Sequence, residues 1–329
     1  MGSTSDNLKS IVIAATPTAP LLSHLLHALS HQPGITVTVL TRKTTVSLPL
    51  SSGHSHSHNH DSNAHHHDAE ILHIETSFSA AELQTHLRKN DTLICYLEGS
   101  DLHLSADLID AATAAGVKTF IPSEYGLDTS NAKVRELLHP YRMRYETQQK
   151  LKSSGMNWTA IYSGVELEEA MKADGVLGID CLWASVVVFP HDRNLRIAVS
   201  TYKDIAKSIV EVATERRKVE GNEVWTCSFQ ASQDELVEAV EKKLERGLDR
   251  YEGLIEGAKK EANERMRRGY FDGGVALMGR VAVWDDRVGA WAGWKGVSEG
   301  GKDGWRDEVG RVALTVRNGE IGGDGGCGC

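Results

Sequence analysis

The sequence lacks any apolar run long enough to cross a membrane. No segment approaches the roughly 20 uninterrupted apolar residues that a membrane-spanning helix requires. The N-terminal residues MGSTSDNLKS also lack the apolar core of a secretory signal peptide. We therefore expect no membrane partner and a cytoplasmic location.

Positive charge is scarce as well. The 329 residues include 36 Lys and Arg against 45 Asp and Glu, which gives a formal net charge of −9. No segment concentrates basic residues on a surface that would neutralise a run of phosphates. Nucleic acid is therefore not expected as a direct partner.

Cysteines are few, and their positions do not suggest disulfides. Three of the five stand singly inside apolar, strand-like runs: Cys95, Cys181 and Cys227. Such positions are typical of buried, reduced thiols. The other two, Cys327 and Cys329, end a Gly-rich tail with C-x-C spacing, which is not the C-x-x-C spacing of redox or zinc sites. We favour a tail without a specific role.

The first half of the sequence contains an alternation of short apolar strands and amphipathic helices. Strands are expected at 10–15, 35–40, 71–75, 92–97 and 117–122, and helices at 21–29, 80–87 and 104–115. Each strand is nearly all apolar, which is typical of a parallel sheet covered on both faces. The sequence therefore predicts an α/β protein with a doubly wound parallel sheet.

The pattern becomes irregular in the second half. We expect a long polar helix from Gly126 through Leu151, a sixth strand at 158–164, hairpin strands at 181–190 and 195–200, and helices at 203–214 and 232–254. The expected domains are the sheet domain over 1–164, a smaller C-terminal substrate lobe over 165–297, and a Gly-rich, disordered tail over 298–329.

A His-rich insertion, GHSHSHNHDSNAHHHD, occupies residues 53–68 between the second and third expected strands. Its seven histidines can bind Zn, Ni or Cu weakly, but the sequence around them offers no fixed geometry. We favour an incidental metal-binding loop over a functional metal centre and assign no metal site.

Three segments together resemble one known family. They are LIDAATAAGVK (108–118), FIPSEYG (120–126) and SSGMNWTAIYSG (153–164), and TYKDIAKSIVEV (201–212) extends the likeness. They resemble the NmrA-like and isoflavone-reductase-like branch of the atypical short-chain dehydrogenases, over roughly residues 10–240. The resemblance implies a Rossmann-like NAD(P)-binding domain over 1–164 and, from fungal members, a reductase of secondary metabolism.

The fifth expected strand ends within the FIPSEYG motif, so the residues that follow it lie at the carboxyl edge of the sheet, where open α/β sheets bind ligands. The resemblance implies that Ser123, Glu124 and Tyr125 border the nicotinamide end of a cofactor. The alternative is that Glu124 and Tyr125 only cap the sheet and pack beneath the second lobe. We favour the cofactor interpretation.

The phosphate-binding loop departs from the family pattern. The resemblance implies G-x-x-G-x-x-G after the first strand, but residues 14–21 read AATPTAPL, without a glycine. Pro17 and Pro20 remove two backbone donors, whereas Thr16 and Thr18 add hydroxyls. Thr18 is a candidate N-cap, and Pro20 suits the first helical position. Affinity for a pyrophosphate is therefore in question.

The second strand ends at basic residues, Arg42 and Lys43, and no acidic residue stands there. The resemblance implies an Arg that recognises the 2′-phosphate of NADP, whereas NAD-specific folds carry an acidic residue at this point. NADP(H) is therefore the expected cofactor, with Arg42 on the phosphate and Lys43 as an auxiliary charge. Two exposed basic residues that start a loop remain the alternative.

The catalytic position is also altered. The resemblance implies a general acid–base Lys on the helix after the motif, at the position that Arg144 occupies here. Arginine stays protonated, so it can polarise a carbonyl but is a poor proton donor. The Tyr-x-x-x-Lys pair is absent, and Tyr141, Tyr145 and Lys150 are the nearby substitutes. Arg144 and Tyr145 are the candidate catalytic residues.

Two functions remain open. The first is an NADP(H)-dependent reductase of a small aromatic or polyketide-like metabolite, in which Arg144 or Tyr145 stabilises the developing oxyanion. The second is a non-catalytic NmrA-like protein that acts as a dinucleotide sensor or binds a protein partner. The family resemblance favours the reductase, whereas the missing glycines and the Arg at position 144 favour the sensor.

Overall fold

The structure is a computed structural model that describes residues 9–42, 69–172, 175–189, 195–294 and 304–320. Lys43, the His-rich insertion, Cys327 and Cys329 lie outside these residues. Two compact units divide the chain, and neither is continuous. The first unit holds Met1–Ser123, Met143–Ile161 and Ala206–Val224, and the second holds Glu124–Arg142, Tyr162–Ile205 and Trp225–Cys329. This division differs from the continuous boundary expected at residue 164.

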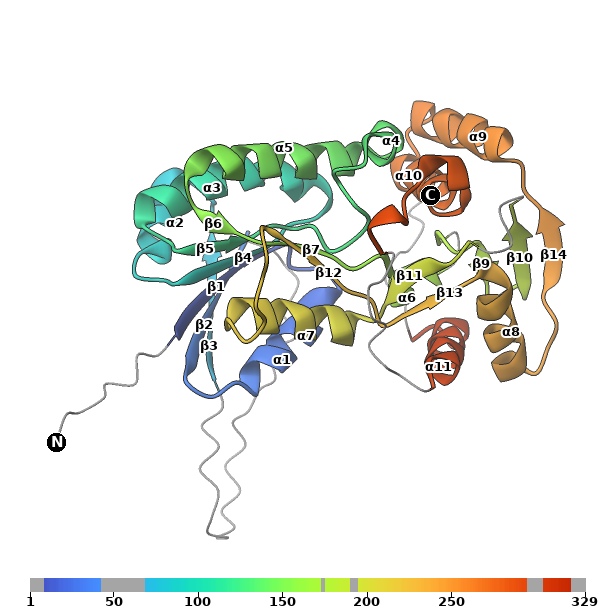
Figure 1. Ribbon diagram of the computed structural model, residues 1–329, viewed down its shortest axis with the longest axis horizontal. Coiled ribbons are helices and arrows are strands. Elements are labelled where there is room, and N and C mark those ends of the chain that lie inside the picture. Colours follow the sequence, from blue (N-terminus) through green and yellow to red (C-terminus); the bar gives the residue numbers. More distant parts are fainter. Residues whose placement is uncertain (1–8, 43–68, 173–174, 190–194, 295–303, 321–329) are drawn as a thin grey trace, which may run out of the picture. The chain divides into compact units, whose positions relative to one another are not determined.

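A six-stranded parallel sheet in the order β3-β2-β1-β4-β5-β6 forms the first unit (Figure 1). Its strands are β1 (Lys9–Ala15), β2 (Ile35–Arg42), β3 (Glu70–Thr76), β4 (Thr92–Tyr96), β5 (Thr119–Ile121) and β6 (Asn157–Trp158). Ile11 of β1 pairs with Val37 on one side and with Thr92 on the other. The chain therefore reverses its direction of travel across the sheet beside β1, which is where such sheets bind ligands.

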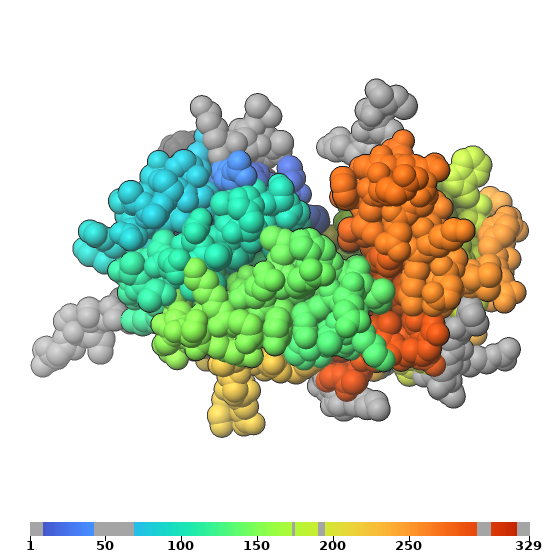
Figure 2. All heavy atoms as spheres, turned by 90° about the horizontal axis from the view of Figure 1, so that it is seen from above, coloured from blue at the N-terminus to red at the C-terminus, as the bar shows by residue number. Residues whose placement is uncertain are grey.

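Helices cover both faces of this sheet, which confirms the predicted doubly wound α/β fold (Figure 1). The helices α2 (Ala80–Leu87), α3 (Ser105–Ala115) and α5 (His139–Ser154) lie over one face, and Figure 2 shows them from cyan to green. The helices α1 (Leu21–Ser30) and α7 (Tyr202–Ala213) lie over the other face. Every leucine of α1 is buried, because the apolar side chains recur on one side of the helix.

Two expected elements near residues 126–164 are divided. The long polar helix consists of α4 (Ala132–Leu137) and α5, separated at Leu138, whose backbone is extended. Pro140 follows in the first turn of α5, where its missing amide is tolerated. The expected sixth strand consists of β6 and β7 (Ala160–Tyr162), and β7 pairs with β12 (Glu223–Trp225) instead of joining the large sheet.

Short strands form two three-stranded sheets in the second unit, in the orders β14-β10-β9 and β13-β11-β8. They are β8 (Val165–Glu166), β9 (Ile179–Asp180), β10 (Ser185–Val188), β11 (Ile197–Ser200), β13 (Phe229–Ala231) and β14 (Asp249–Glu252). The expected hairpin of 181–190 with 195–200 is wrong, because β10 and β11 belong to different sheets. The expected helix over 232–254 is only α8 (Gln233–Leu244), which ends before β14 at Glu245, where φ is 52°.

The remaining helices complete the second unit, apart from the 3-10 turn η1 (Gly99–Leu104), which precedes α3. They are α6 (Leu167–Ala170), α9 (Ile255–Arg267), α10 (Phe271–Trp284), α11 (Trp305–Arg317) and the 3-10 turns η2 (Asp286–Val288) and η3 (Ala292–Trp294). None of the helices that the structure describes is long and apolar enough to span a membrane.

Helix α11 corrects the expectation of a disordered tail over 298–329. Its apolar side chains recur at helical spacing, with Val309, Val312, Ala313 and Val316 buried. This face packs against α8, and the Trp305 ring stacks on Phe229 with centroids 4.7 Å apart. The glycines around the helix obscured this apolar pattern in the sequence.

Candidate nucleotide-binding site

A closed β-turn joins β1 to α1, at the position of the family's phosphate-binding loop. The Thr16 amide donates to the Tyr96 carbonyl at 3.0 Å, and the Ala19 amide donates to the Thr16 carbonyl at 3.0 Å. Pro17 is the second residue of this turn, a position that its fixed φ favours. The turn therefore forms without glycine, and two of its amides, those of Thr16 and Ala19, bond to backbone carbonyls.

Two amides at the N-terminus of α1 bond within the protein. The Leu21 amide donates to the Tyr96 hydroxyl at 3.1 Å, and the Leu22 amide donates to the Ala19 carbonyl at 3.1 Å. The expectation that Thr18 is the N-cap is wrong: Pro20 stands at that position, without a side-chain cap, and Thr18 is exposed. The Tyr96 hydroxyl oxygen accepts the amide of Leu21, the first residue of the helix, and so provides an acceptor that Pro20 does not supply.

Thr18 keeps its donors available for a ligand. Within the described residues, its amide makes no hydrogen bond to the protein. Its neighbours Pro17 and Pro20 have no amide hydrogen. The turn therefore offers the amide and hydroxyl of Thr18 to a pyrophosphate, where a glycine-rich loop would offer several amides.

Arg42 and Thr16 meet at Asp101, an acidic residue that the sequence analysis missed. The Arg42 Nη1 lies 2.8 Å from Asp101 Oδ1, and the Thr16 hydroxyl donates to Asp101 Oδ2 at 3.1 Å. The Thr16 hydroxyl also accepts the Glu98 amide at 3.0 Å, so its single proton is directed to Asp101. One carboxylate thus joins two of the predicted cofactor-binding residues.

Exposure differs between the members of this ion pair. The Asp101 side chain is 12% exposed, whereas the Arg42 side chain is 51% exposed. Asp101 lies in η1 directly after β4, and β2 and β4 both flank β1 in the sheet. The sequence offered one signal for this residue: an acidic side chain shortly after β4, the strand that lies beside β1 on the side opposite β2.

The FIPSEYG residues are buried. Ser123, in the first unit, is 5% exposed and donates its hydroxyl to the Leu97 carbonyl at 2.9 Å. Glu124 and Tyr125, in the second unit, are 0% and 2% exposed. This burial agrees with the packing alternative, and contact of the three residues with a cofactor stays a prediction.

Arg144 lies on α5, close enough to Cys95 of β4 for its charge to act on that thiol. Burial raises the pKa of the Cys95 thiol to about 11, and the positive charge of Arg144 is among the smaller influences that oppose this rise. Tyr145 is partly buried on the same helix. The other substitutes are engaged elsewhere: Lys150 pairs with Asp110 at 2.6 Å, and the Tyr141 hydroxyl accepts the Leu127 amide at 3.1 Å.

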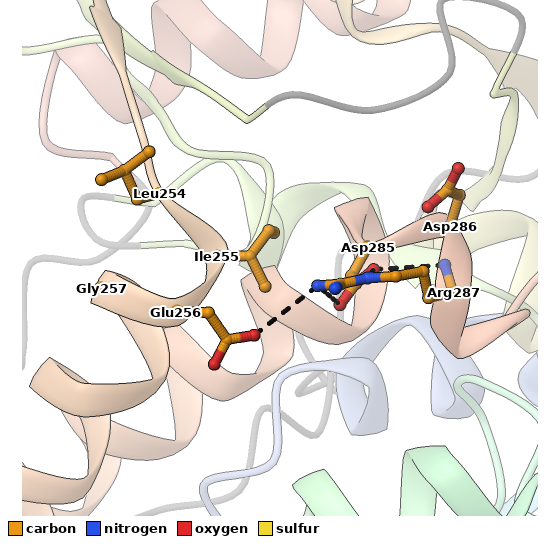
Figure 3. Close-up of a pocket in the computed structure, with 7 residues that line it drawn as sticks. All are labelled: Leu254, Ile255, Glu256, Gly257, Asp285, Asp286 and Arg287. Atoms are coloured by element: carbon orange, nitrogen blue, oxygen red, sulfur yellow. Dashed lines mark hydrogen bonds and ion pairs between the residues drawn. The ribbon is translucent and has the colours of Figure 1, made fainter.

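A separate surface pocket of about 380 Å³ lies in the second unit and is lined by Leu254, Ile255, Glu256, Gly257, Asp285, Asp286 and Arg287 (Figure 3). Arg287 extends between Asp285, 2.7 Å away, and Glu256, 3.7 Å away. Its guanidinium lowers the pKa of the Asp285 carboxyl. Arg287, Asp285 and Glu256 are paired with one another, so we assign no ligand to this pocket. Among the described residues, no cluster of three or more His, Cys, Asp or Glu side chains is arranged to hold a metal ion.

A family model decides the relationship of this chain to known proteins. The model of the NmrA-like family matches residues 11–268. The chain belongs to the NmrA-like family. This confirms the family to which the FIPSEYG segment and its flanking motifs pointed.

Two curated fungal relatives of this NmrA-like protein are oxidoreductases. Oxidoreductase poxI of Penicillium oxalicum is 27% identical over 174 residues, which cover 51% of this chain and 55% of poxI. The chain thus spans about half the length of this relative. Oxidoreductase aprR of Aspergillus flavus is 25% identical over 277 residues, 82% of this chain and 86% of aprR.

The fold is also similar to that of a solved plant reductase. The binary complex of leucoanthocyanidin reductase with NADPH, from Vitis vinifera, superposes with a TM-score of 0.66. The alignment covers 93% of this chain and 99% of the reductase at 16% identity. At this identity, the likeness establishes the Rossmann-like fold.

Proposed function

We propose that the protein is an NADP(H)-dependent reductase of a small aromatic or polyketide-like metabolite. Membership of the NmrA-like family supports this proposal, as do the two fungal oxidoreductases and the NADPH complex of the plant reductase with the same fold. The substrate class follows the resemblance to fungal reductases of secondary metabolism.

The observation that carries the proposal is the position of Arg42. It ends β2 beside the switch point of the sheet, and half of its side chain is exposed to solvent. A planar guanidinium with several donors suits a phosphate, so Arg42 is assigned to the 2′-phosphate of NADP(H), with Lys43 as an auxiliary charge. Thr18 and Thr16 face the diphosphate in this proposal, and Ser123, Glu124 and Tyr125 border the nicotinamide.

The residues fit the two phosphate groups unequally. Arg42 provides a charged, accessible partner for the 2′-phosphate, whereas the turn after β1 has only the Thr18 amide to offer among its described backbone donors. Binding is therefore expected to depend more on side chains than on backbone amides.

The chemistry assigned to this chain is stabilisation of negative charge. NADPH, when bound, supplies a hydride to the electrophilic carbon of the substrate. Arg144 or Tyr145 then stabilises the oxyanion that develops, Arg144 through its permanent charge and Tyr145 through its hydroxyl. A proton from Tyr145 or from water completes the reduction.

Calorimetric titration with NADPH tests the proposal. Binding is expected, and Arg42→Ala is expected to weaken it about tenfold or more, because a charge-assisted contact contributes about 1.5–3 kcal/mol. The Lys150→Ala variant removes a cation that pairs with Asp110 on α3, so it serves as a control with unchanged affinity. Absence of binding at millimolar NADPH would remove the reductase from consideration.

Arg144 can be tested once a substrate is identified. Arg144→Lys restores the family's acid–base group and keeps the charge, so turnover is expected to be retained or to increase. Arg144→Ala is expected to lower turnover about a hundredfold, which is typical for the loss of an oxyanion-stabilising donor. Unchanged turnover of Arg144→Ala would withdraw the residue from the catalytic assignment.

The second candidate is a non-catalytic dinucleotide sensor or partner-binding protein. The closed turn favours it, since the amides of Thr16, Ala19, Leu21 and Leu22 are all engaged within the protein. A sensor would bind nucleotide without turnover, and a partner-binding protein would bind a protein in its absence. The NADPH titration separates the partner-binding protein from the reductase, because only the reductase requires NADPH binding.

A further inference from the structure

Asp101 adds a negative charge at the end of β2, where the sequence alone shows only the basic residues Arg42 and Lys43. In the sequence no acidic residue follows the second strand, and this absence favours NADP(H) over NAD(H). In the fold, the first residues after β4 bring a carboxylate to the same edge, 2.8 Å from the Arg42 guanidinium. The charge at the end of β2 is therefore paired.

This pairing weakens the attraction of Arg42 for a phosphate. The carboxylate neutralises the guanidinium, and a 2′-phosphate on Arg42 would add about −1.5 to −2 of charge close to Asp101. Like charges at this distance repel each other, and low solvent exposure of the Asp101 side chain limits screening of that repulsion. Asp101 thus opposes the NADP-specific group.

The same carboxylate suits the other cofactor. Its two oxygens offer about four acceptor positions, of which Arg42 and Thr16 occupy one each. In NAD-binding folds, a carboxylate after the second strand accepts the ribose 2′-hydroxyl. Here the Arg42 and Thr16 contacts hold a carboxylate with remaining acceptor positions beside the end of β2, although it comes from the segment after β4.

We infer that Asp101 gives the nucleotide site dual specificity, with Arg42 as the partner of the 2′-phosphate of NADPH and Asp101 as the partner of the 2′-hydroxyl of NADH. The inference rests on the proposed function, and it assigns the discrimination between the two cofactors to one ion pair. The two dissociation constants in the unaltered protein then differ by less than about tenfold.

Two substitutions separate the members of the pair. Asp101→Asn keeps an oxygen acceptor for Arg42 or Thr16 but removes the charge, so the preference for NADPH over NADH rises about tenfold. Arg42→Ala leaves the carboxylate in place, so the preference inverts and NADH binds more tightly than NADPH. If Arg42 alone set the specificity, Arg42→Ala would at most remove the preference for NADPH and would not invert it.

The experiment is calorimetric titration of the full chain and both variants with NADPH and with NADH. Asp110→Asn, on the exposed side of α3, is the matched control, and its ratio of dissociation constants stays at that of the unaltered protein. Thermal unfolding of each variant identifies the folded ones, and if Asp101→Asn does not fold, inversion of the ratio by Arg42→Ala decides the question alone.

The outcomes distinguish this inference from the proposed function. A strong NADPH preference in the unaltered protein, or an unchanged ratio in Asp101→Asn together with no inversion in Arg42→Ala, overturns the role of Asp101 and leaves the reductase proposal standing. Failure of the unaltered protein and of Asp101→Asn to bind either nucleotide overturns both. A small preference that the two variants drive in opposite directions supports the inference.

Discussion

Two buried carboxylates, one in each compact unit, are stabilised in different ways. Asp101, in the first unit, contacts the Arg42 guanidinium and the Thr16 hydroxyl. Glu168, in the second unit, accepts the Tyr202 amide with both oxygens, each 3.1 Å away. Within the described residues Glu168 forms no ion pair, and Arg311 acts on it only from a distance.

The difference shows how partner chemistry decides the fate of a buried charge. Burial raises the pKa of Glu168 to about 7, and the nearby carboxylate of Glu308 adds to the rise. Asp101 has a cation in direct contact, and that cation is itself half exposed at the edge of the sheet. The Asp101 carboxyl group, held by Arg42 and Thr16, keeps acceptor positions for a ligand, whereas burial of Glu168 favours the neutral form of that residue.

The largest expected effect is a dependence of stability on pH through Glu168. Its pKa is higher in the folded chain than its ordinary value of 4.5, so folding binds a proton between pH 4.5 and 7. The associated stability is fully present below pH 4.5 and is lost as the pH rises through 7. Glu168→Gln mimics the protonated form, so at pH 8 it should be more stable than the unaltered protein by about 3 kcal/mol.

Urea unfolding at pH 5 and pH 8 measures this effect. The difference between Glu168→Gln and the unaltered protein should shrink to within about 1 kcal/mol at pH 5. The neighbouring Glu169→Gln, which changes a half-exposed side chain, is the control and should leave the pH dependence unchanged. An equal difference at both pH values would mean that Glu168 stays ionised in the folded chain.

The sequence predicted the local features of the first unit well and the non-local ones poorly. Helix α2 matches its expected range of 80–87, and β2 begins at residue 35 as expected, because apolar periodicity is a local property. Arg42 and Thr16 were predicted to bind the cofactor, but Asp101, which contacts both, was not noted. The pair joins residues 59 positions apart, and only the order of the strands in the sheet brings the segment after β4 to the end of β2.

The misassigned elements in the second unit have the same origin. The pairing of β10 and β11 with different sheets depends on partners far along the chain, so two adjacent apolar runs resembled a hairpin. Tyr96 was classified only as a strand residue, since its bond to Leu21 spans 75 positions. Local patterns predicted most helices and strands of the first unit, whereas contacts between residues far apart in the chain determine strand pairing, helix capping and charge pairing.

The hydrogen bond from the Leu21 amide to the Tyr96 hydroxyl joins two uncharged groups, so it can be compared with the ion pair of Asp101. Tyr96 and Leu21 are 1% and 0% exposed, so Tyr96→Phe leaves the Leu21 amide buried without its acceptor. We expect a loss of about 1–3 kcal/mol in the free energy of unfolding, measured by urea titration. Tyr270→Phe removes a hydroxyl from a side chain that is 68% exposed and should change stability by less than about 0.5 kcal/mol.

The opposite result for Tyr96→Phe would be informative about the turn. A loss below about 0.5 kcal/mol would mean that water or a shifted backbone replaces the hydroxyl at the N-terminus of α1. The closed turn would then be less rigid than its hydrogen bonds indicate, and its amides would be more accessible to a pyrophosphate.

The smallest expected effect on stability is that of breaking the Arg42–Asp101 pair itself. Arg42→Ala leaves the carboxylate, 12% exposed, without its cation, but Thr16 still donates to it and the removed guanidinium was half in water. The loss should therefore be about 1 kcal/mol, below the 3–5 kcal/mol typical of a fully buried pair. Lys150→Ala is the matched control, because its partner Asp110 is 68% exposed and needs no cation, and its effect should be near zero.

Adding Asp101→Asn to Arg42→Ala removes the unpaired charge and should restore most of the loss, since the penalty comes from the charge that remains and not from the missing contact. A double variant less stable than Arg42→Ala alone would show that Asp101 contributes through its bond to Thr16, and Asp101 would then resemble Glu168 in being held by hydrogen bonds instead of by a cation.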